Sequence, residues 1–146
     1  MKNFFFLILG LIIIGGSVFL FFGQTPIGKS EVKIIKINDV SIEVEVADTY
    51  ETRKLGLSGK PDLPDGTGMF FIFETPDQYG FWMKDMNFAI DIVWIDENLR
   101  VVNVERGVLP ETFPQVFYPN KAVKYVLELP AGAAVKYRID VGAVVQ

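Results

Sequence analysis

Charged residues that stand inside apolar sequence are the first candidates for chemistry in this chain. Glu128 lies between leucines, and Asp91 lies between isoleucines. A charge in a buried strand is costly unless it is paired. Lys84, Asp85 and Asp91 fall where one expected strand ends and the next begins, so a loop at a sheet end can bring them together. The full candidate cluster is Arg53, Lys84, Asp85, Asp91 and Glu128.

This cluster has several interpretations. Glu128 paired with Arg53 or Lys84 would be an ion pair that fixes strand register. Alternatively, the five residues would line a ligand or catalytic site, and two carboxylates about 5–9 Å apart suit hydrolysis of a glycosidic bond. Asp85, Asp91 or the loop at 62–65 could also offer hard oxygen ligands to calcium or magnesium, although no EF-hand spacing is present. A last alternative is a set of unrelated surface charges.

Aromatic residues form a second candidate set. Tyr79 and Tyr118 lie at the ends of expected strands or loops, where a ring can stay accessible, and Trp82 lies within an expected strand, on the face opposite Phe81 and Met83. They would form an aromatic platform for a sugar ring or a proline-rich peptide. The alternative for each ring is packing in the core, which is the usual fate of an aromatic side chain.

The chain has no Cys and no His, which removes several classes of chemistry. A disulfide framework, a Cys/His zinc site and a haem ligated by a protein His or Cys are excluded. A Ser-His-Asp triad and a Cys-His pair are excluded as well. The sequence contains no cofactor motif, so we expect no cofactor and no metal centre.

Residues 4–22 form an uncharged, strongly apolar stretch of the length that spans a bilayer. We therefore predict an N-terminal membrane anchor or signal segment at 1–23, a linker at 24–30 and a folded domain at 31–146. An uncleaved anchor is favoured, because five apolar residues follow the small triplet at 15–17 and a cut after Gly23 would place Phe21 at an unfavourable position.

The folded part is mildly acidic and shows no basic stripe, which makes nucleic acid an unsuitable partner. Lysines at 29, 33 and 36 outnumber Lys2 on the other side of the apolar stretch. Long domains cross a membrane largely regardless of such charge. We expect a single-pass protein of the cell membrane whose domain lies on the extracytoplasmic side.

Period-2 patterns separated by turn signals predict a mainly β domain. A hairpin is expected over 31–48, with a four-residue loop at 38–41 that sets Ile37 opposite Ile42. A short helix is expected to begin with Asp48 as N-cap and Glu51 at N3. Further strands are predicted at 69–73, 79–84, 90–96, 100–105, 123–129 and 141–145, with a long loop at 106–120 and a second short helix at 131–137. The predicted fold is an antiparallel β-sandwich or open barrel with two short helices, preceded by one transmembrane helix.

Three blocks of sequence resemble a known family. These blocks are EVADTYETRKLGLSGKPDLPDGTGMFFIF, FWMKDMNFAIDIVWID and YVLELPAG, in this order. They are similar to the DUF192 family, also called UPF0127, over roughly residues 40–145. The resemblance implies a compact, mostly β domain, often behind a signal peptide or membrane anchor, and it implies no activity. Asp85, Met86, Ala89 and Lys60 stand where the family pattern often has Asn, Thr, Pro and Arg.

The favoured function is a membrane-anchored extracytoplasmic module that binds an envelope ligand, either a glycan or a protein. One alternative is a hydrolase that acts on envelope carbohydrate through carboxylates. The other is a structural accessory subunit without a ligand site. The sequence does not distinguish these three hypotheses.

Overall fold

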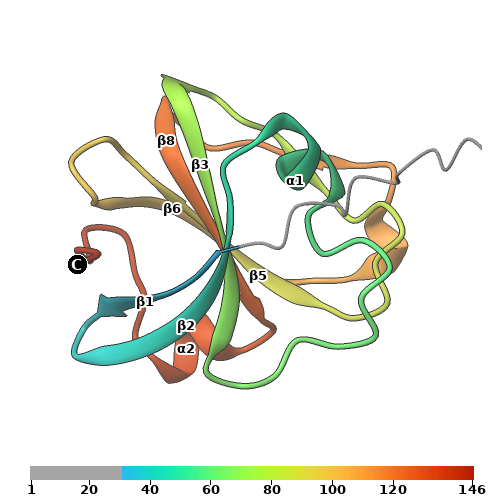
Figure 1. Cartoon of the computed structure of the whole chain (residues 1–146), viewed down its shortest axis with the longest axis horizontal. Coiled ribbons are helices and arrows are strands. Elements are labelled where there is room, and N and C mark those ends of the chain that lie inside the picture. Colours follow the sequence, from blue (N-terminus) through green and yellow to red (C-terminus); the bar gives the residue numbers. More distant parts are fainter. Residues whose placement is uncertain (1–30) are drawn as a thin grey trace, which may run out of the picture.

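Six of the eight strands form one open sheet, and the sheet makes residues 31–146 a mainly β domain (Figure 1). The computed structural model describes these residues, so the predicted transmembrane helix at 4–22 lies outside the described part of the chain. The strands in spatial order are β1 (Val32–Ile37), β2 (Val40–Ala47), β3 (Thr67–Asp77), β8 (Val123–Pro130), β5 (Ile90–Ile95) and β6 (Val101–Val108).

Smaller elements cover this sheet. The short strands β4 (Phe81–Trp82) and β7 (Val116–Phe117) pair in an antiparallel ribbon. The helices are α1 (Tyr50–Leu55), α2 (Ala133–Lys136) and the 3-10 turn η1 (Pro110–Thr112). The prediction of a mainly β fold with two short α-helices is therefore confirmed. Neither helix within 31–146 has the length and apolar character that crossing a bilayer requires.

One strand pair departs from the predicted antiparallel arrangement. β2 and β3 are parallel, with Val44 opposite Gly68 and Ala47 opposite Phe71. A parallel pair needs a long crossover, because the chain must return to the end of the sheet from which it came. The segment at 48–66 makes this return and contains α1. The prediction of a wholly antiparallel sheet was wrong here, and the crossover is what places α1 over the sheet.

The β1–β2 hairpin has a tighter turn than predicted. Asn38 and Asp39 both have positive φ angles, 49° and 66°, and they form a two-residue turn. Turns of this kind match the twist of the strands, and Asn and Asp tolerate the left-handed conformation. Ile37 therefore lies opposite Val40, and the predicted partner Ile42 lies opposite Ile35. This shift by two positions leaves every side chain on its predicted face.

The cap of α1 lies one residue later than predicted. Thr49 is the N-cap, and its Oγ1 accepts a hydrogen bond from the Thr52 N–H at 3.1 Å. The Thr49 N–H donates in turn to Thr52 Oγ1 at 3.0 Å, which completes a capping box. Asp48 instead uses its carbonyl oxygen to accept from the Arg53 Nη1 at 2.5 Å. The cap thus orients Arg53 toward the sheet.

The segments next to β4 and β7 contain less strand than predicted. The expected strand at 79–84 shrinks to β4, and the expected loop at 106–120 contains η1 and β7. At the C-terminus, Val144 and Val145 form isolated bridges to Arg100 and Ile37 instead of a full strand. The C-terminal segment therefore links β1 to the start of β6 across the open side of the sheet.

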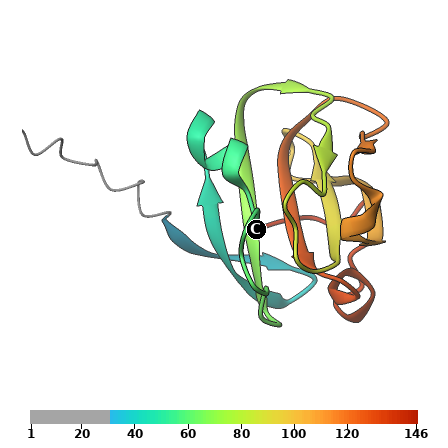
Figure 2. The same ribbon diagram turned by 90° about the vertical axis from the view of Figure 1, so that its right-hand side faces the viewer.

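The two faces of the sheet bury different clusters. On β5 and β8, successive residues alternate between them, as the period of a strand requires. Leu127, Leu129 and Val93 belong to the first face, which packs against the alanines of α2. Trp94 and Ile92 belong to the second face, which packs toward β4 and the loop after α1. Figure 2 shows α1 and α2 on different sides of the domain.

Candidate functional site

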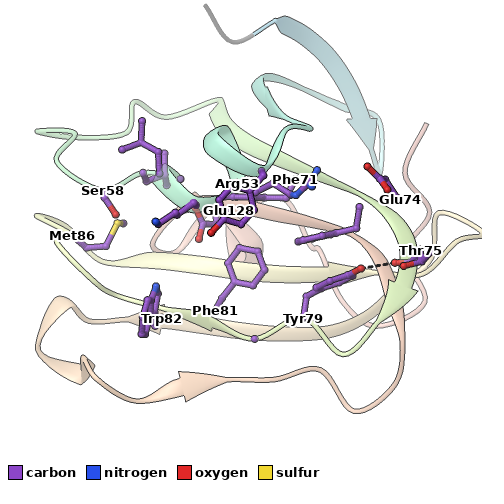
Figure 3. A pocket seen from close by; sticks show the side chains of 17 residues that line it. Arg53, Ser58, Phe71, Glu74, Thr75, Tyr79, Phe81, Trp82, Met86 and Glu128 are labelled. Carbon is purple, nitrogen blue, oxygen red and sulfur yellow. Dashed lines mark hydrogen bonds between the residues drawn. The ribbon is translucent and has the colours of Figure 1, made fainter. Parts of the chain in front are cut away.

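A pocket of about 480 Å³ lies over the second face of the sheet, between α1 and β4. Six aromatic side chains line it, and polar groups from α1, β3 and β8 face into it (Figure 3). Its lining includes Tyr50, Arg53, Phe71, Phe73, Tyr79, Trp82 and Glu128.

Glu128 supplies a carboxyl group to this pocket from the centre of the sheet. β8 is an interior strand, and Glu128 lies opposite Met69 on β3 and Ile92 on β5. The residue is only 5% exposed, and its Oε2 has no hydrogen-bond partner among residues 31–146. Burial raises the pKa of Glu128 to about 8, since water cannot stabilise the charged form. At neutral pH the carboxyl is therefore mostly protonated.

The aromatic wall is held in place by ring contacts and by two hydrogen bonds. Phe71 meets Phe81 edge-to-face at 4.9 Å between centroids, and Phe73 stacks on Tyr79 at 3.5 Å. The Tyr79 hydroxyl donates to the Thr75 carbonyl at 2.6 Å. The buried Trp94 donates from Nε1 to the Tyr79 carbonyl at 3.0 Å. Because the rings are fixed from several sides, the pocket is preformed.

Arg53 faces the pocket from α1, but its guanidinium group interacts with backbone carbonyls and with an aromatic ring. Besides its bond to Asp48, Nη1 donates to the Ile72 carbonyl at 2.8 Å. The guanidinium also lies 5.3 Å from the centroid of the Phe73 ring, a cation–π distance. Arg53 and Glu128 therefore share the pocket, but no ion pair joins them in the described part of the chain.

Lys84 and Asp85 form an exposed turn outside the pocket lining. The Lys84 carbonyl accepts from Ser58 Oγ at 2.9 Å, and the Lys84 Nζ lies 6.0 Å from the Trp82 ring centroid. Asp85 has a φ of 56°, and its carbonyl accepts from the Gly59 N–H at 2.9 Å. Among residues other than glycine, Asn and Asp best tolerate this left-handed conformation. The backbone thus explains why either one suits this position.

Asp91 is fully buried on the opposite face of the sheet from Glu128. Asp91 on β5 lies opposite Leu129 on β8, whereas the next residue, Ile92, lies opposite Glu128. Its Oδ1 accepts from the Gly107 N–H and its Oδ2 from the Ala134 N–H, both at 2.8 Å. Asp91 thus ties β6 and the start of α2 to β5. Of the predicted cluster, the structure brings together only Arg53 and Glu128.

The predicted aromatic platform is also divided. Tyr79 and Trp82 line the pocket, and the Trp82 ring is about half exposed at its mouth. Tyr118 does not line it but packs against the backbone of Gly80, where an added Cβ would meet the Tyr118 ring at 2.5 Å. Tyr118 therefore contacts the pocket wall only through Gly80, which lines the pocket.

Several wall residues were missed by the sequence analysis. Phe71 and Phe73 are two positions apart on β3, in phase with Met69, so they share the face on which Glu128 lies. That alternation was a usable signal. Tyr50 and Met86 had no such signal, because their place in the lining depends on the paths of the crossover and of the 84–89 loop.

The oxygen ligands considered for a cation do not converge. No group of three or more acidic side chains suited to a metal ion occurs within residues 31–146. Asp91 is occupied by backbone amides, and Asp85 lies in the exposed turn. In the 62–65 loop, Asp65 accepts from the Lys136 ammonium and the Tyr137 hydroxyl. The Lys136 hydrogen bond is the main reason that the pKa of Asp65 is lowered.

Sequence comparison assigns the family. The DUF192 model, described as "Uncharacterized ACR", matches residues 33–146. The chain belongs to the DUF192 family. A UPF0127 protein of Pyrococcus abyssi is 31% identical over 105 residues, a match that covers 68% of this chain and 81% of that relative. DUF192 membership brings no established activity, so a function has to be inferred from the pocket itself.

Solved structures show the same fold. A candidate transcription regulator of Sinorhizobium meliloti superposes with a TM-score of 0.76 at 20% identity, over 81% of this chain and 95% of that one. A protein of unknown function from Novosphingobium aromaticivorans superposes with a TM-score of 0.77 at 24% identity, over 83% and 89% of the two chains. At these identities the likeness concerns the DUF192 fold alone.

Proposed function

We propose that this DUF192 protein is a membrane-anchored extracytoplasmic binding module whose pocket holds a sugar ring of an envelope glycan. The observation that carries this proposal is the buried Glu128 carboxyl, whose Oε2 has no hydrogen-bond partner among residues 31–146. Leaving a buried polar group without a partner costs stability. Groups of this kind concentrate at functional sites. A ligand that hydrogen-bonds to Glu128 would recover the cost.

The lining suits a polyhydroxylated ring. The walls present apolar ring faces from Phe71, Tyr79 and Trp82, which match the C–H faces of a sugar. Because its pKa lies near 8, the Glu128 carboxyl is neutral at pH 7 and can both donate and accept a hydrogen bond. A sugar hydroxyl has the same two capacities, so one hydroxyl can satisfy both carboxyl oxygens.

The size of the pocket favours a glycan over a protein ligand. Small-molecule pockets have volumes of about 300–1,000 Å³. The pocket at Glu128, at about 480 Å³, falls in this range and suits one or two sugar rings. A protein partner would need a much larger contact surface than this pocket offers.

A hydrolase is the second candidate, and one observation favours it. A carboxyl group with a raised pKa is what a general acid needs, and Glu128 has this property. However, the other carboxylate of the predicted pair, Asp91, faces the opposite side of the sheet. The remaining carboxylate in the lining is Glu74, which is exposed. We therefore prefer binding and make hydrolysis an outcome of the test.

The test uses the full-length chain in detergent micelles, titrated calorimetrically with soluble peptidoglycan fragments and neutral oligosaccharides. We expect saturable binding that weakens by at least about tenfold in Glu128→Leu, because the ligand loses its buried partner. Glu97→Gln, a change in an exposed turn, is the matched control and should bind like the wild type.

Two results would change the proposal. Binding that is equal in the wild type and in Glu128→Leu, or no binding of any fragment, would refute the glycan pocket. Release of reducing ends by the wild type, lost in both Glu128→Gln and Glu74→Gln, would instead establish the hydrolase.

A further inference from the structure

Exposed aromatic side chains gather at one part of the surface. Residues 31–146 have four of them, and all lie on α1, on β4 or on the segment from η1 to Tyr118. Tyr50 is 67% exposed and Trp82 is 51% exposed, and both line the mouth of the pocket. Phe113 meets the Trp82 ring at 5.7 Å. Single exposed apolar residues are normal, but aromatic residues concentrated at one site indicate a binding surface.

The exposed aliphatic Leu55 extends the same surface. It is 50% exposed and lines the pocket mouth from α1, as Tyr50 does. We refer to Tyr50, Leu55, Trp82 and Phe113 as the pocket rim.

The chain enters the domain beside the end of β2 that leads into α1, the helix that carries Tyr50 and Leu55 of the pocket rim. The carbonyl of Glu31 accepts a hydrogen bond from the Val46 N–H at 2.8 Å, and Val46 lies at the end of β2 that leads into α1. The apolar segment predicted to be the anchor ends at Phe22, so eight residues, 23–30, separate it from the domain. Eight residues span at most about 25–30 Å. The α1 end of the domain would therefore stay close to the bilayer.

We propose that the pocket rim docks onto the headgroup region of the bilayer that holds the anchor, an inference that rests on the membrane anchoring proposed above. Trp and Tyr prefer this region, where the ring is half apolar and half wet. Lys54 lies 5.8 Å from the Tyr50 ring centroid, and Lys84 lies beside Trp82. Both can bury their stems while the ammonium group reaches the headgroups.

The docking is apolar and tether-assisted rather than electrostatic. Glu51 and Asp85 are exposed within three residues of these lysines in the chain, and the exposed Glu74 lines the pocket together with Lys54, so the surface has no excess of positive charge. A short tether raises the effective concentration of the domain at the membrane to about 1 mM or more. A weak affinity of the pocket rim for the headgroup region is therefore sufficient. The pocket then opens onto the membrane surface, and its ligand is a glycan carried at that surface.

The two tryptophans of the chain provide the measurement. Trp94 is fully buried, so Trp82 is the only one of the two at the surface. The full-length chain is reconstituted into vesicles of phosphatidylcholine and phosphatidylglycerol, either plain or with acyl chains brominated near the headgroup. The Trp82 emission, taken as wild type minus Trp82→Phe, should fall at least about twofold in the brominated vesicles.

A second reporter position serves as the matched control. Val135 is 66% exposed on α2, whose alanines pack on the opposite face of the sheet from the pocket. Val135→Trp, made in the Trp82→Phe chain, should give an emission that bromine leaves unchanged. Equal quenching at both positions would show general contact with lipid and would overturn the assignment of the rim.

Flotation of the same vesicles separates the two proposals. A chain that does not float lacks the anchor, and both proposals then fail. If the chain floats but its Trp82 emission is equal in plain and brominated vesicles, the chain is anchored. The docking proposal alone is then refuted. If Trp82 is shielded from aqueous acrylamide without quenching by bromine, another protein or a second copy covers the rim, which also overturns it.

Discussion

The two buried carboxyl groups of the sheet, Asp91 and Glu128, lie on adjacent strands and have opposite surroundings. Asp91 accepts hydrogen bonds from two backbone amides and connects three elements of the fold. Glu128 lies one register position away, on the other face, with its Oε2 unpartnered by the described residues. Burial of a carboxyl group therefore does not by itself indicate its role. The hydrogen-bond partners make the difference: Asp91 joins three elements of the fold, whereas Glu128 has a carboxyl oxygen that no described residue satisfies, and we propose that a ligand does so.

The largest effect is expected at Asp91. Asp91→Ala leaves the Gly107 and Ala134 amides without acceptors in the interior, and we expect the free energy of unfolding to fall by about 3–5 kcal/mol. Urea denaturation measures the loss. Asp91→Asn keeps one acceptor and should lose less. If Asp91→Ala lowered the free energy of unfolding by less than about 1 kcal/mol, the structural role assigned to Asp91 would be wrong.

The pH dependence of stability should come from Glu128. Its pKa is about 8 in the folded state and near 4.5 in the unfolded state, so the folded state binds more protons between these values. Stability is then full below pH 4.5 and is lost as the pH rises through 8. The expected loss from pH 5 to pH 8 is about 3 kcal/mol.

Glu128→Gln is the matched control for this prediction. Glutamine resembles the protonated carboxyl in shape and does not titrate, so the difference between the wild type and the variant isolates the contribution of Glu128. Parallel stability curves for the two proteins would show that the carboxyl is not desolvated.

Glu128→Leu should make the protein more stable, in contrast to every change at Asp91. An apolar side chain removes a buried polar group without a partner, and we expect a gain of about 1–3 kcal/mol at pH 7. Thermal or urea unfolding of the variant tests this directly. A loss of stability would mean that Glu128 has a structural role, as the accessory-subunit hypothesis requires.

The smallest effects on stability are expected from removing one tyrosine hydroxyl on each face of the sheet. Tyr79→Phe removes the bond to the Thr75 carbonyl in the pocket wall, and Tyr137→Phe removes the bond to Asp65 near α2. Each should cost about 1 kcal/mol of stability. Only Tyr79→Phe should also weaken glycan binding, as measured by calorimetry. Equal effects on affinity at both positions would place the ligand outside the pocket.

Local features could be predicted from the sequence to the extent that they depend on neighbours in the chain. The β1–β2 hairpin, β5, β8 and both short helices were expected near their observed positions, because alternation and turn residues act locally. The errors were also local: the turn at Asn38 has two residues rather than four, and the α1 cap is Thr49 rather than Asp48. In both places neighbouring residues were equally suited to the same position, in the turn or at the N-cap. The backbone dihedral angles determine which of them takes that position.

Three features could be predicted from the sequence alone: two acids within apolar strands, a mainly β domain and the resemblance to DUF192. The tertiary structure was needed to show that Asp91 and Glu128 face opposite sides of the sheet, and that Arg53 is the one other member of the predicted charged cluster in the Glu128 pocket. The physical reason is that period-2 alternation sets the faces within one strand, whereas the relation between two strands depends on register. The parallel β2–β3 crossover, which carries α1 over the sheet, depends on contacts between residues far apart in the chain.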